Sequence, residues 1–135
     1  MRRLFLLLLP LALACGDDDS TTQPTLASLA GTWDLQSVNG SPLPYVVLQT
    51  STSKSELMSD VITVTTTGSY TQLTTVRNTL NGQVTTQTGN GAGTFTLNGT
   101  ALTFQASNGT SGTGTVSGTT FTLPLAGSSY LYKKR

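Results

Sequence analysis

Histidine is absent from this sequence, and cysteine occurs once, at Cys15. Zinc, copper and haem iron are held mainly by histidine and cysteine side chains, so the usual ligand sets for these metals cannot be assembled. Catalytic pairs that join a serine or cysteine nucleophile to a histidine base are excluded for the same reason. We therefore expect no metal site, no cofactor and no catalytic residues, and we predict that the protein is not an enzyme.

Charge is also scarce, because Asp, Glu, Lys and Arg together make up 10% of the chain. The few basic residues form no stripe, so nucleic acid is not an expected partner. Beyond the first 25 positions the only acidic residues are Asp34, Glu56 and Asp60. We expect Glu56 and Asp60 to be solvated loop charges, Asp34 to point outward from a strand, and Arg77 to be a solvated charge at a strand edge.

The beginning of the chain has the pattern of an export signal. Arg2 and Arg3 precede an apolar run over positions 4–11, which is shorter than the roughly 20 residues that span a bilayer. Small residues then lead to Cys15, and the run Leu11-Ala12-Leu13-Ala14-Cys15 resembles the lipobox of bacterial lipoproteins, shifted by one position. In that family the leader is removed and the cysteine is acylated, with chains such as palmitate. The resemblance implies a lipid anchor on Cys15; the alternative is an ordinary secretory peptide with a spare thiol.

Three segments are predicted along the chain. They are a signal peptide over 1–14, a lipidated cysteine with a flexible acidic tether over 15–25, and a single domain over 26–135. The tether is polar and has nothing to bury, so we expect it to be disordered. The lipoprotein resemblance implies a place in the bacterial cell envelope, facing the periplasm or on the cell surface. Gly16 stands where an Asp would favour inner-membrane retention in enterobacteria, so the outer membrane is favoured over the inner.

The predicted domain reads as strands separated by tight turns, after one helical turn that we expect between Thr25 as N-cap and Gly31. Thr, Val, Phe and Tyr dominate, and apolar residues alternate with threonine, which is typical of an antiparallel sheet with one wet face. Asn-Gly and similar dipeptides recur at short intervals and predict hairpins between sequential strands. The expected strands are 32–38, 45–50, 57–66, 69–77, 83–88, 93–97, 101–105, 112–116, 119–123 and 129–133. A meander of about 8–10 strands with one apolar face favours closure into a small barrel.

Gly31 and Trp33 open this meander, and the basic cluster Lys133-Lys134-Arg135 ends it. A Gly-x-Trp motif at the head of a barrel, with a basic residue on the last strand, is similar to the lipocalin and fatty-acid-binding (calycin) group. The run from Leu29 to Pro44 also resembles the start of small bacterial lipocalin-like lipoproteins. The resemblance implies an all-β, up-and-down lipocalin-like barrel in which one terminal basic residue lies over the indole of Trp33. Lys133 and Arg135 share one strand face and Lys134 takes the other, so the sequence leaves that residue undecided.

The resemblance implies a lipid-anchored protein that binds a small hydrophobic ligand inside the barrel. On our register, the candidate lining residues are Leu35, Ile62, Val64, Tyr70, Phe95, Leu97, Phe104 and Phe121. The alternative function is an interaction module with a filled core, such as an enzyme inhibitor or an envelope-assembly accessory that binds another envelope protein through its loops. An apolar cavity above roughly 300 Å³ would favour ligand binding, and a packed interior would favour the alternative.

Overall fold

The computed structural model describes residues 22–135, so the predicted signal peptide, Cys15 and most of the predicted tether lie outside the described residues. The described part begins with a short helix, α1 (Leu26–Leu29), whose N-cap is Thr25 as expected. The Thr25 hydroxyl accepts a hydrogen bond from the backbone N–H of Ser28, and the Ser28 hydroxyl accepts one from the backbone N–H of Thr25. This capping box stabilises a single turn of helix, which ends at Ala30, one residue earlier than predicted.

Ten strands follow α1, and all of their pairings are antiparallel, which confirms the predicted all-β meander. They are β1 (Gly31–Val38), β2 (Ser41–Pro42), β3 (Tyr45–Gln49), β4 (Ser53–Val64), β5 (Ser69–Leu80), β6 (Gln83–Asn98), β7 (Ala101–Ala106), β8 (Ser111–Ser117), β9 (Thr120–Leu125) and β10 (Ser128–Lys134). Asn39 and Asn81 adopt the positive φ angles, 52° and 47°, that the first position of a type I′ turn requires.

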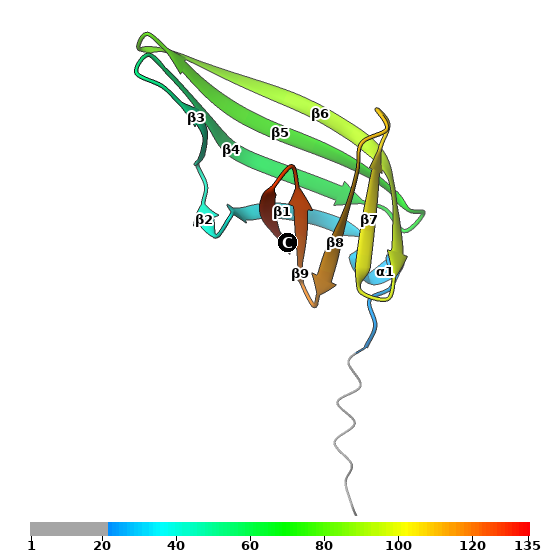
Figure 1. Ribbon diagram of the computed structural model, residues 1–135. Helices are drawn as coiled ribbons and strands as arrows, with labels where there is room; N and C mark the ends of the chain where they lie inside the picture. The colour runs from blue at the N-terminus through cyan, green and yellow to red at the C-terminus, as the bar shows by residue number, and fades with distance from the viewer. Residues whose placement is uncertain (1–21) are drawn as a thin grey trace, which may run out of the picture.

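The first strand closes the sheet into a barrel. β1 pairs with β10 on one side and with β4 on the other, while β4 to β10 follow one another in sequence order. The closed ring therefore contains eight strands, and β2 and β3 lie outside it. Figure 1 shows β1 crossing beneath the long strands β4, β5 and β6 to join the two ends of the meander. Closure removes the free strand edges that a meander of this length would otherwise expose.

One predicted break in the meander is wrong. The glycine-rich stretch 89–92 was expected to separate two strands, but β6 runs through it without interruption and pairs with β5 from Gln83 to Thr94. Glycine suits this strand because neighbouring groups approach its backbone closely: a Cβ on Gly91 would meet the side chain of Gln72, and one on Gly93 would meet the backbone of Gln105. Glycine in a strand often marks such an approach rather than a turn.

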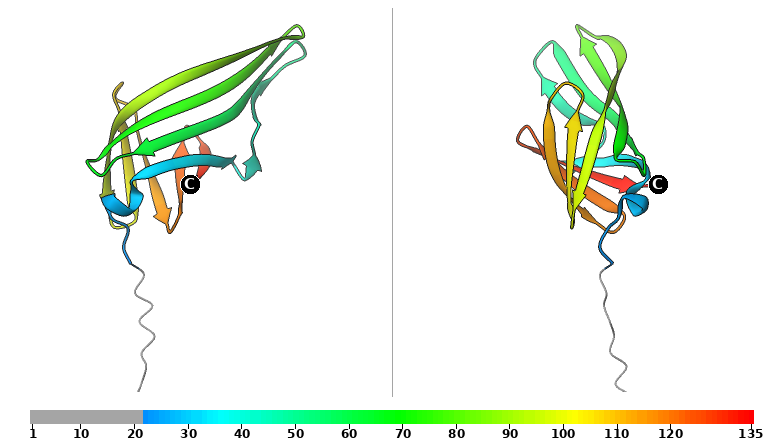
Figure 2. Two further views of the ribbon diagram at one scale, coloured as in Figure 1. Left: turned by 180° about the vertical axis from the view of Figure 1, so that it is seen from behind. Right: turned by 90° about the vertical axis from the view of Figure 1, so that its right-hand side faces the viewer.

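The segment 51–56 falls between two predicted strands, yet β4 already begins at Ser53. β4, β5 and β6 consequently extend well beyond the barrel, with β3 along the edge of β4. We call this four-stranded extension, residues 45–57 and 76–88, the flap. It projects away from the barrel at the end opposite α1, as the two further views in Figure 2 also show.

Candidate functional site

The end of the barrel next to α1 is sealed around Trp33, which is 1% exposed. The indole N–H donates a hydrogen bond of 2.8 Å to the carbonyl of Leu29 in α1. The ammonium group of Lys134 lies 6.0 Å from the centroid of the Trp33 ring and donates to the carbonyl of Ser28 at 2.7 Å. Lys134 is therefore the terminal basic residue that covers the tryptophan, at a distance where a cation–π attraction operates.

The other two terminal basic residues lie elsewhere. The guanidinium group of Arg135 forms two hydrogen bonds to the carboxylate of Asp34, at 2.7 and 2.8 Å. These bonds hold the pKa of Asp34 below its ordinary value. Lys133 is exposed. The alternation of the strand thus places Lys134 on the face toward the indole, with Lys133 and Arg135 on the other face.

Gly31 allows Lys134 to reach the indole. Its φ angle is +129°, and a Cβ at this position would lie 3.1 Å from Cε of Lys134. An L-residue with a side chain rarely adopts such a backbone conformation. The glycine of the Gly-x-Trp motif therefore serves two needs, a strained backbone angle and room for the stem of the lysine.

Aromatic rings fill the half of the barrel above Trp33. The Phe121 ring lies 5.0 Å from Trp33, stacks on Tyr132 at 4.6 Å and lies 5.6 Å from Phe104. Tyr70 meets Phe104 edge-on at 5.1 Å. Such tilted and edge-to-face pairs are favourable beyond the area that they bury, so this half of the interior is a packed core.

The other half contains a cavity of about 410 Å³. Its wall is partly apolar, with Leu57, Ile62 and Leu123 among the lining residues. The exposed turn between β7 and β8, including Asn108 and Thr110, forms part of its rim. That turn lies at the end of the barrel opposite α1, because β7 runs away from the sealed end. The cavity volume falls within the range of about 300–1,000 Å³ that small-molecule sites occupy.

The structure divides the eight predicted lining residues into two groups. Ile62, Tyr70 and Phe104 lie in the cavity wall. The other five are not part of that wall: Leu97 is half-buried against the core, and the remaining four are core residues, namely Leu35, Val64, Phe95 and Phe121. The alternation identified the inward face correctly, but it carries no information about which inward residues are packed and which face a space.

A carboxylate that the sequence interpretation placed in a solvated loop lies in the cavity wall. Asp60 is on β4 and is 5% exposed. Its Oδ2 accepts hydrogen bonds from Nε2 of Gln72 at 2.7 Å and from the hydroxyl of Tyr132 at 2.9 Å. Its Oδ1 accepts a longer one, 3.2 Å, from the hydroxyl of Thr74. All four of these side chains line the cavity.

Two opposing effects act on Asp60. Burial raises its pKa, and the hydrogen bonds from Tyr132, Gln72 and Thr74 lower it without cancelling the rise. The pKa of Tyr132 is raised in turn, first by burial and then by the neighbouring carboxylate of Asp60. The hydrogen bonds that Asp60 accepts favour its ionised form, but its removal from water favours the neutral form and is the larger effect.

Asp60 could have been found by extending a pattern already visible in the sequence. Ile62 and Val64 were assigned to the inward face, and the period of two puts Asp60 on the same face. A bulge between Leu57 and Ser59 then shifts the register of β4 against β5, so that Leu57 also faces the cavity. No feature of the sequence indicated this bulge. Because the bulge interrupts the alternation, the sequence did not show that the strand continues from Asp60 back through Glu56.

These observations define the fold: a closed antiparallel meander sealed at one end by Trp33, with Lys134 of the last strand over the indole. The barrel is lipocalin-like. Among solved structures, the chain is similar to a lipocalin-like protein from Bacteroides uniformis ATCC 8492, with 19% sequence identity, coverage of 80% of this chain and 99% of that chain, and a TM-score of 0.45. No protein-family model and no curated protein matches the sequence.

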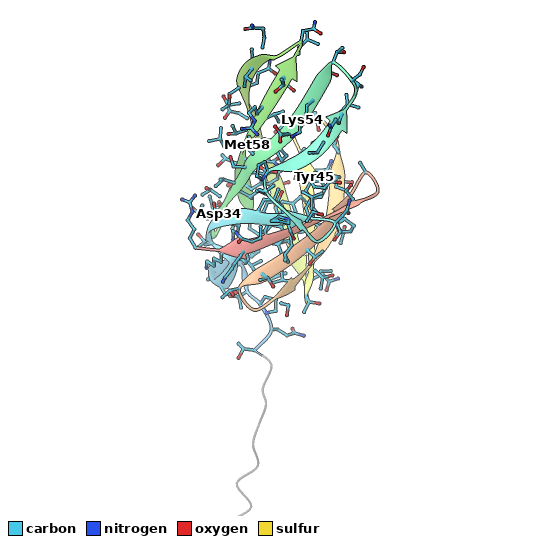
Figure 3. The ribbon with its side chains drawn as sticks, turned by 90° about the vertical axis from the view of Figure 1, so that its left-hand side faces the viewer. Asp34, Tyr45, Lys54 and Met58 are labelled. Carbon is cyan, nitrogen blue, oxygen red and sulfur yellow. The ribbon has the colours of Figure 1, made fainter. Side chains whose placement is uncertain are left out.

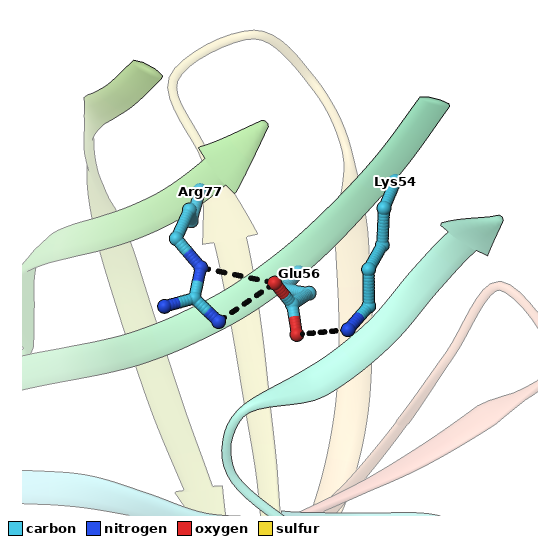
Figure 4. Close-up of polar contacts among 3 residues, drawn as sticks. All are labelled: Lys54, Glu56 and Arg77. Carbon is cyan, nitrogen blue, oxygen red and sulfur yellow. Dashed lines mark hydrogen bonds and ion pairs between the residues drawn. The ribbon is translucent and has the colours of Figure 1, made fainter. Parts of the chain in front are cut away.

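A second buried acid of the lipocalin-like barrel, Glu56, lies on the flap and faces away from the cavity. It was also expected to be a solvated loop charge, but it is 5% exposed and lies on β4. Lys54 reaches it at 2.7 Å, and Arg77 donates two hydrogen bonds at 2.9 and 2.8 Å. Figure 4 shows the two cationic side chains reaching Glu56 from either side. Hydrogen bonds from Lys54 and then Arg77 hold the pKa of Glu56 below its ordinary value.

The expectation that Arg77 is a solvated edge charge is therefore wrong. β5 continues to Leu80, which places Arg77 inside the strand and directly opposite Glu56. Figure 3 shows Lys54 high on the flap, whereas Asp34 lies lower, on β1. The ion pairs of the lipocalin-like barrel thus occupy two separate places, and neither belongs to the cavity.

Two kinds of structural feature are absent from residues 22–135. No group of three or more Cys, Asp or Glu side chains in this part of the chain is arranged to hold a metal ion. No helix within the same range is long and apolar enough to cross a membrane.

Proposed function

We propose that this protein is an envelope binding protein whose lipocalin-like barrel holds a small, largely apolar molecule, while a lipid on Cys15 anchors it to a membrane. The cavity carries the proposal. Its volume of about 410 Å³ exceeds the roughly 300 Å³ expected of a site for a small molecule. Its wall combines apolar and aromatic side chains with a few polar groups, which is the usual composition of such sites.

The anchoring part of the proposal rests on the lipobox-like run that ends at Cys15 and on the direction in which the chain leaves the barrel. Residues 22–25 lead away from α1, at the sealed end (Figure 1). The turn between β7 and β8, which forms part of the cavity rim, lies at the opposite end. A lipid attached before residue 22 would therefore leave the mouth of the cavity unobstructed by the anchor.

Binding is tested by titrating the purified protein with N-phenyl-1-naphthylamine, a neutral apolar dye that fluoresces in apolar surroundings. The wild-type protein should bind it, and Ala106→Trp, which places an indole in the cavity wall, should weaken binding by at least tenfold. Ala101→Trp is the matched control, because Ala101 is exposed at the other end of the same strand. Absence of binding to the wild type, or equal loss in both variants, would refute the proposal.

The alternative function, an interaction module, is favoured by one observation. Leu48, Leu80 and Val84 on the flap are each about 60% exposed, which is unusual for large apolar side chains in strands. Native mass spectrometry of protein extracted from its own host distinguishes the two functions. A co-purifying small molecule supports ligand binding, and a stoichiometric protein partner without any small molecule supports the alternative.

A further inference from the structure

Asp60 differs from the other acids of the described chain in having no cation beside it. Asp34 is paired with Arg135, and Glu56 is paired with Lys54 and Arg77. Within residues 22–135, the remaining cations are Lys134, which lies over Trp33, and Lys133, which is exposed. No lysine or arginine belongs to the cavity wall. The cavity therefore presents one carboxyl group that has no lysine or arginine of the described residues beside it.

The hydrogen bonds around Asp60 hold the carboxylate in place but leave its charge unpaired. Among side chains, Gln72 and Tyr132 both donate to Oδ2, whereas Thr74 alone donates to Oδ1, through the longer bond. The backbone N–H of Val61 is a further donor to the carboxylate. The hydroxyl of Thr74 can turn away from Oδ1 and accept a hydrogen bond instead. A donor that enters the cavity would then find two acceptors together, Oδ1 of Asp60 and Oγ1 of Thr74.

The wall around this carboxylate is aromatic. Tyr70, Phe104, Tyr130 and Tyr132 all line the cavity. Aromatic faces attract an organic cation, and the attraction grows when the cation is removed from water. A hydrated metal ion would fit less well, because a single carboxylate supplies too few ligands. The surroundings thus fit a cation that carries its own apolar body.

We propose that the cavity binds an organic cation, a protonated amine with an apolar body, whose ammonium group donates to Asp60 while the body lies against the aromatic wall. This inference rests on the proposed function, since it names the class of molecule that the cavity takes. The ammonium group supplies the positive partner that Asp60 lacks. The apolar body of the amine matches the rest of the cavity, whose lining is largely apolar and aromatic.

The test compares three ligands with the same chain length but different head groups: octylamine, 1-octanol and octanoate, each titrated calorimetrically at pH 7. An alkylamine is protonated at this pH, as a lysine side chain is. Wild-type protein should bind octylamine at least tenfold more tightly than 1-octanol, and octanoate should bind most weakly. Equal affinity for the amine and the alcohol would overturn the inference.

Asp60→Asn should reduce the preference for the amine to less than twofold while leaving the affinity for N-phenyl-1-naphthylamine within twofold of wild type. Glu56→Gln is the matched control, because it removes a buried carboxylate of the same strand that faces away from the cavity. This variant should keep the full preference. An unchanged preference in Asp60→Asn would overturn the inference even if wild-type protein prefers the amine.

A measurement on wild-type protein alone covers the case in which Asp60→Asn does not fold. The preference for octylamine should disappear as acidification protonates Asp60, with the fold monitored by Trp33 emission. The other titratable groups in the cavity wall are the tyrosines Tyr70, Tyr130 and Tyr132, so Asp60 is the one carboxyl group that lines the cavity. A preference that persists in acid overturns the inference, whereas failure of the neutral dye to bind wild-type protein refutes the proposed function itself.

Discussion

Asp60 and Glu56 lie four positions apart on β4 and are equally hidden from solvent, yet their pKa values move in opposite directions. The difference comes from what covers them. Glu56 is covered by the cationic side chains of Lys54 and Arg77, which stabilise its charge. Asp60 is covered by the barrel interior, where neutral donors compensate only part of the lost hydration. Exposure alone therefore does not determine how a buried acid titrates.

This difference predicts how stability depends on pH. Since the pKa of Asp60 is raised on folding, the folded state binds the proton of Asp60 more readily than the unfolded state does. The free energy of unfolding therefore falls as the pH rises from the pKa of Asp60 in the unfolded state, about 3.9, through its pKa in the folded state. Asp60→Asn lacks this dependence. Urea denaturation between pH 3 and pH 8 should show wild type losing stability relative to Asp60→Asn as the pH rises, by about 1.4 kcal/mol per unit of pKa shift.

Glu56 and Asp34 titrate in the opposite sense, because a lowered pKa stabilises the fold above the unfolded value and that stabilisation is lost as the pH falls. Both acids are present in wild type and in Asp60→Asn, so their contribution cancels in the comparison. A difference in stability that does not change with pH, or that grows in favour of wild type toward neutral pH, would contradict the assignment of Asp60 as a desolvated carboxylate.

The motif at the sealed end supports a second prediction at the residue scale. Gly31→Ala forces a side chain onto a backbone with a φ angle of +129° and against Cε of Lys134. The free energy of unfolding should fall by about 1–3 kcal/mol, measured by urea denaturation. Gly89→Ala is the control, since a Cβ at that position in β6 meets nothing within 4 Å and no positive φ angle is involved. Equal effects of the two substitutions would contradict the role assigned to Gly31.

At the scale of the element, β4 explains why the flap exists and why the sequence interpretation missed it. Ser, Thr and Lys over positions 50–55 have the composition of a loop, but β4 already pairs with its neighbouring strands from Ser53 onward. Pairing with neighbouring strands overrides a weak local preference. The glycines of β6 were misinterpreted for the same reason, because a strand held by its neighbours tolerates residues that would end an isolated one.

The ion pair between Glu56 and Arg77 ties β4 to β5 where both strands leave the barrel, and Lys54 of β4 pairs with the same carboxylate. Glu56→Gln removes the charge that holds Lys54 and Arg77 (Figure 4), so the flap should open more often. Hydrogen exchange measured by mass spectrometry should be faster over residues 45–57 and 76–88 and unchanged in β8 and β9. Asp34→Asn is the matched control, because it breaks the ion pair with Arg135 at the sealed end. Faster exchange in β8 and β9 would indicate global destabilisation instead.

At the scale of the whole molecule, the sequence contained enough to predict the closed barrel but not its interior. Alternation and turn spacing determine the order of the strands, and the Gly31-x-Trp33 motif with the terminal lysine predicts which ends meet. The cavity depends on how aromatic rings from five strands pack next to Trp33 and leave space toward the opposite end of the barrel. Packing of that kind joins residues far apart in the chain, for example Asp60 and Tyr132, and no local pattern records it.

The position of the cavity relative to the chain ends leads to a final prediction about orientation at a membrane. Residues 22–25 leave at the sealed end, and Thr25 lies ten positions after Cys15 in the sequence. Even fully extended, that segment spans roughly 35 Å. A barrel anchored through Cys15 should therefore hold its sealed end near the bilayer and its cavity mouth away from it, open to ligands that approach through the aqueous phase.

The orientation can be measured with dyes attached to two Asn-Gly turns at opposite ends of the barrel. Asn98 precedes Gly99 in the turn at the sealed end, and Asn108 precedes Gly109 at the rim of the cavity. Asn98→Cys and Asn108→Cys, labelled with the same dye in the lipidated protein, should differ in energy transfer to acceptors in the vesicle surface, with stronger transfer from position 98. In Cys15→Ser variants transfer should vanish at both positions, because the anchor is lost. Stronger transfer from position 108 would mean that the mouth faces the bilayer, and that ligands enter from the lipid.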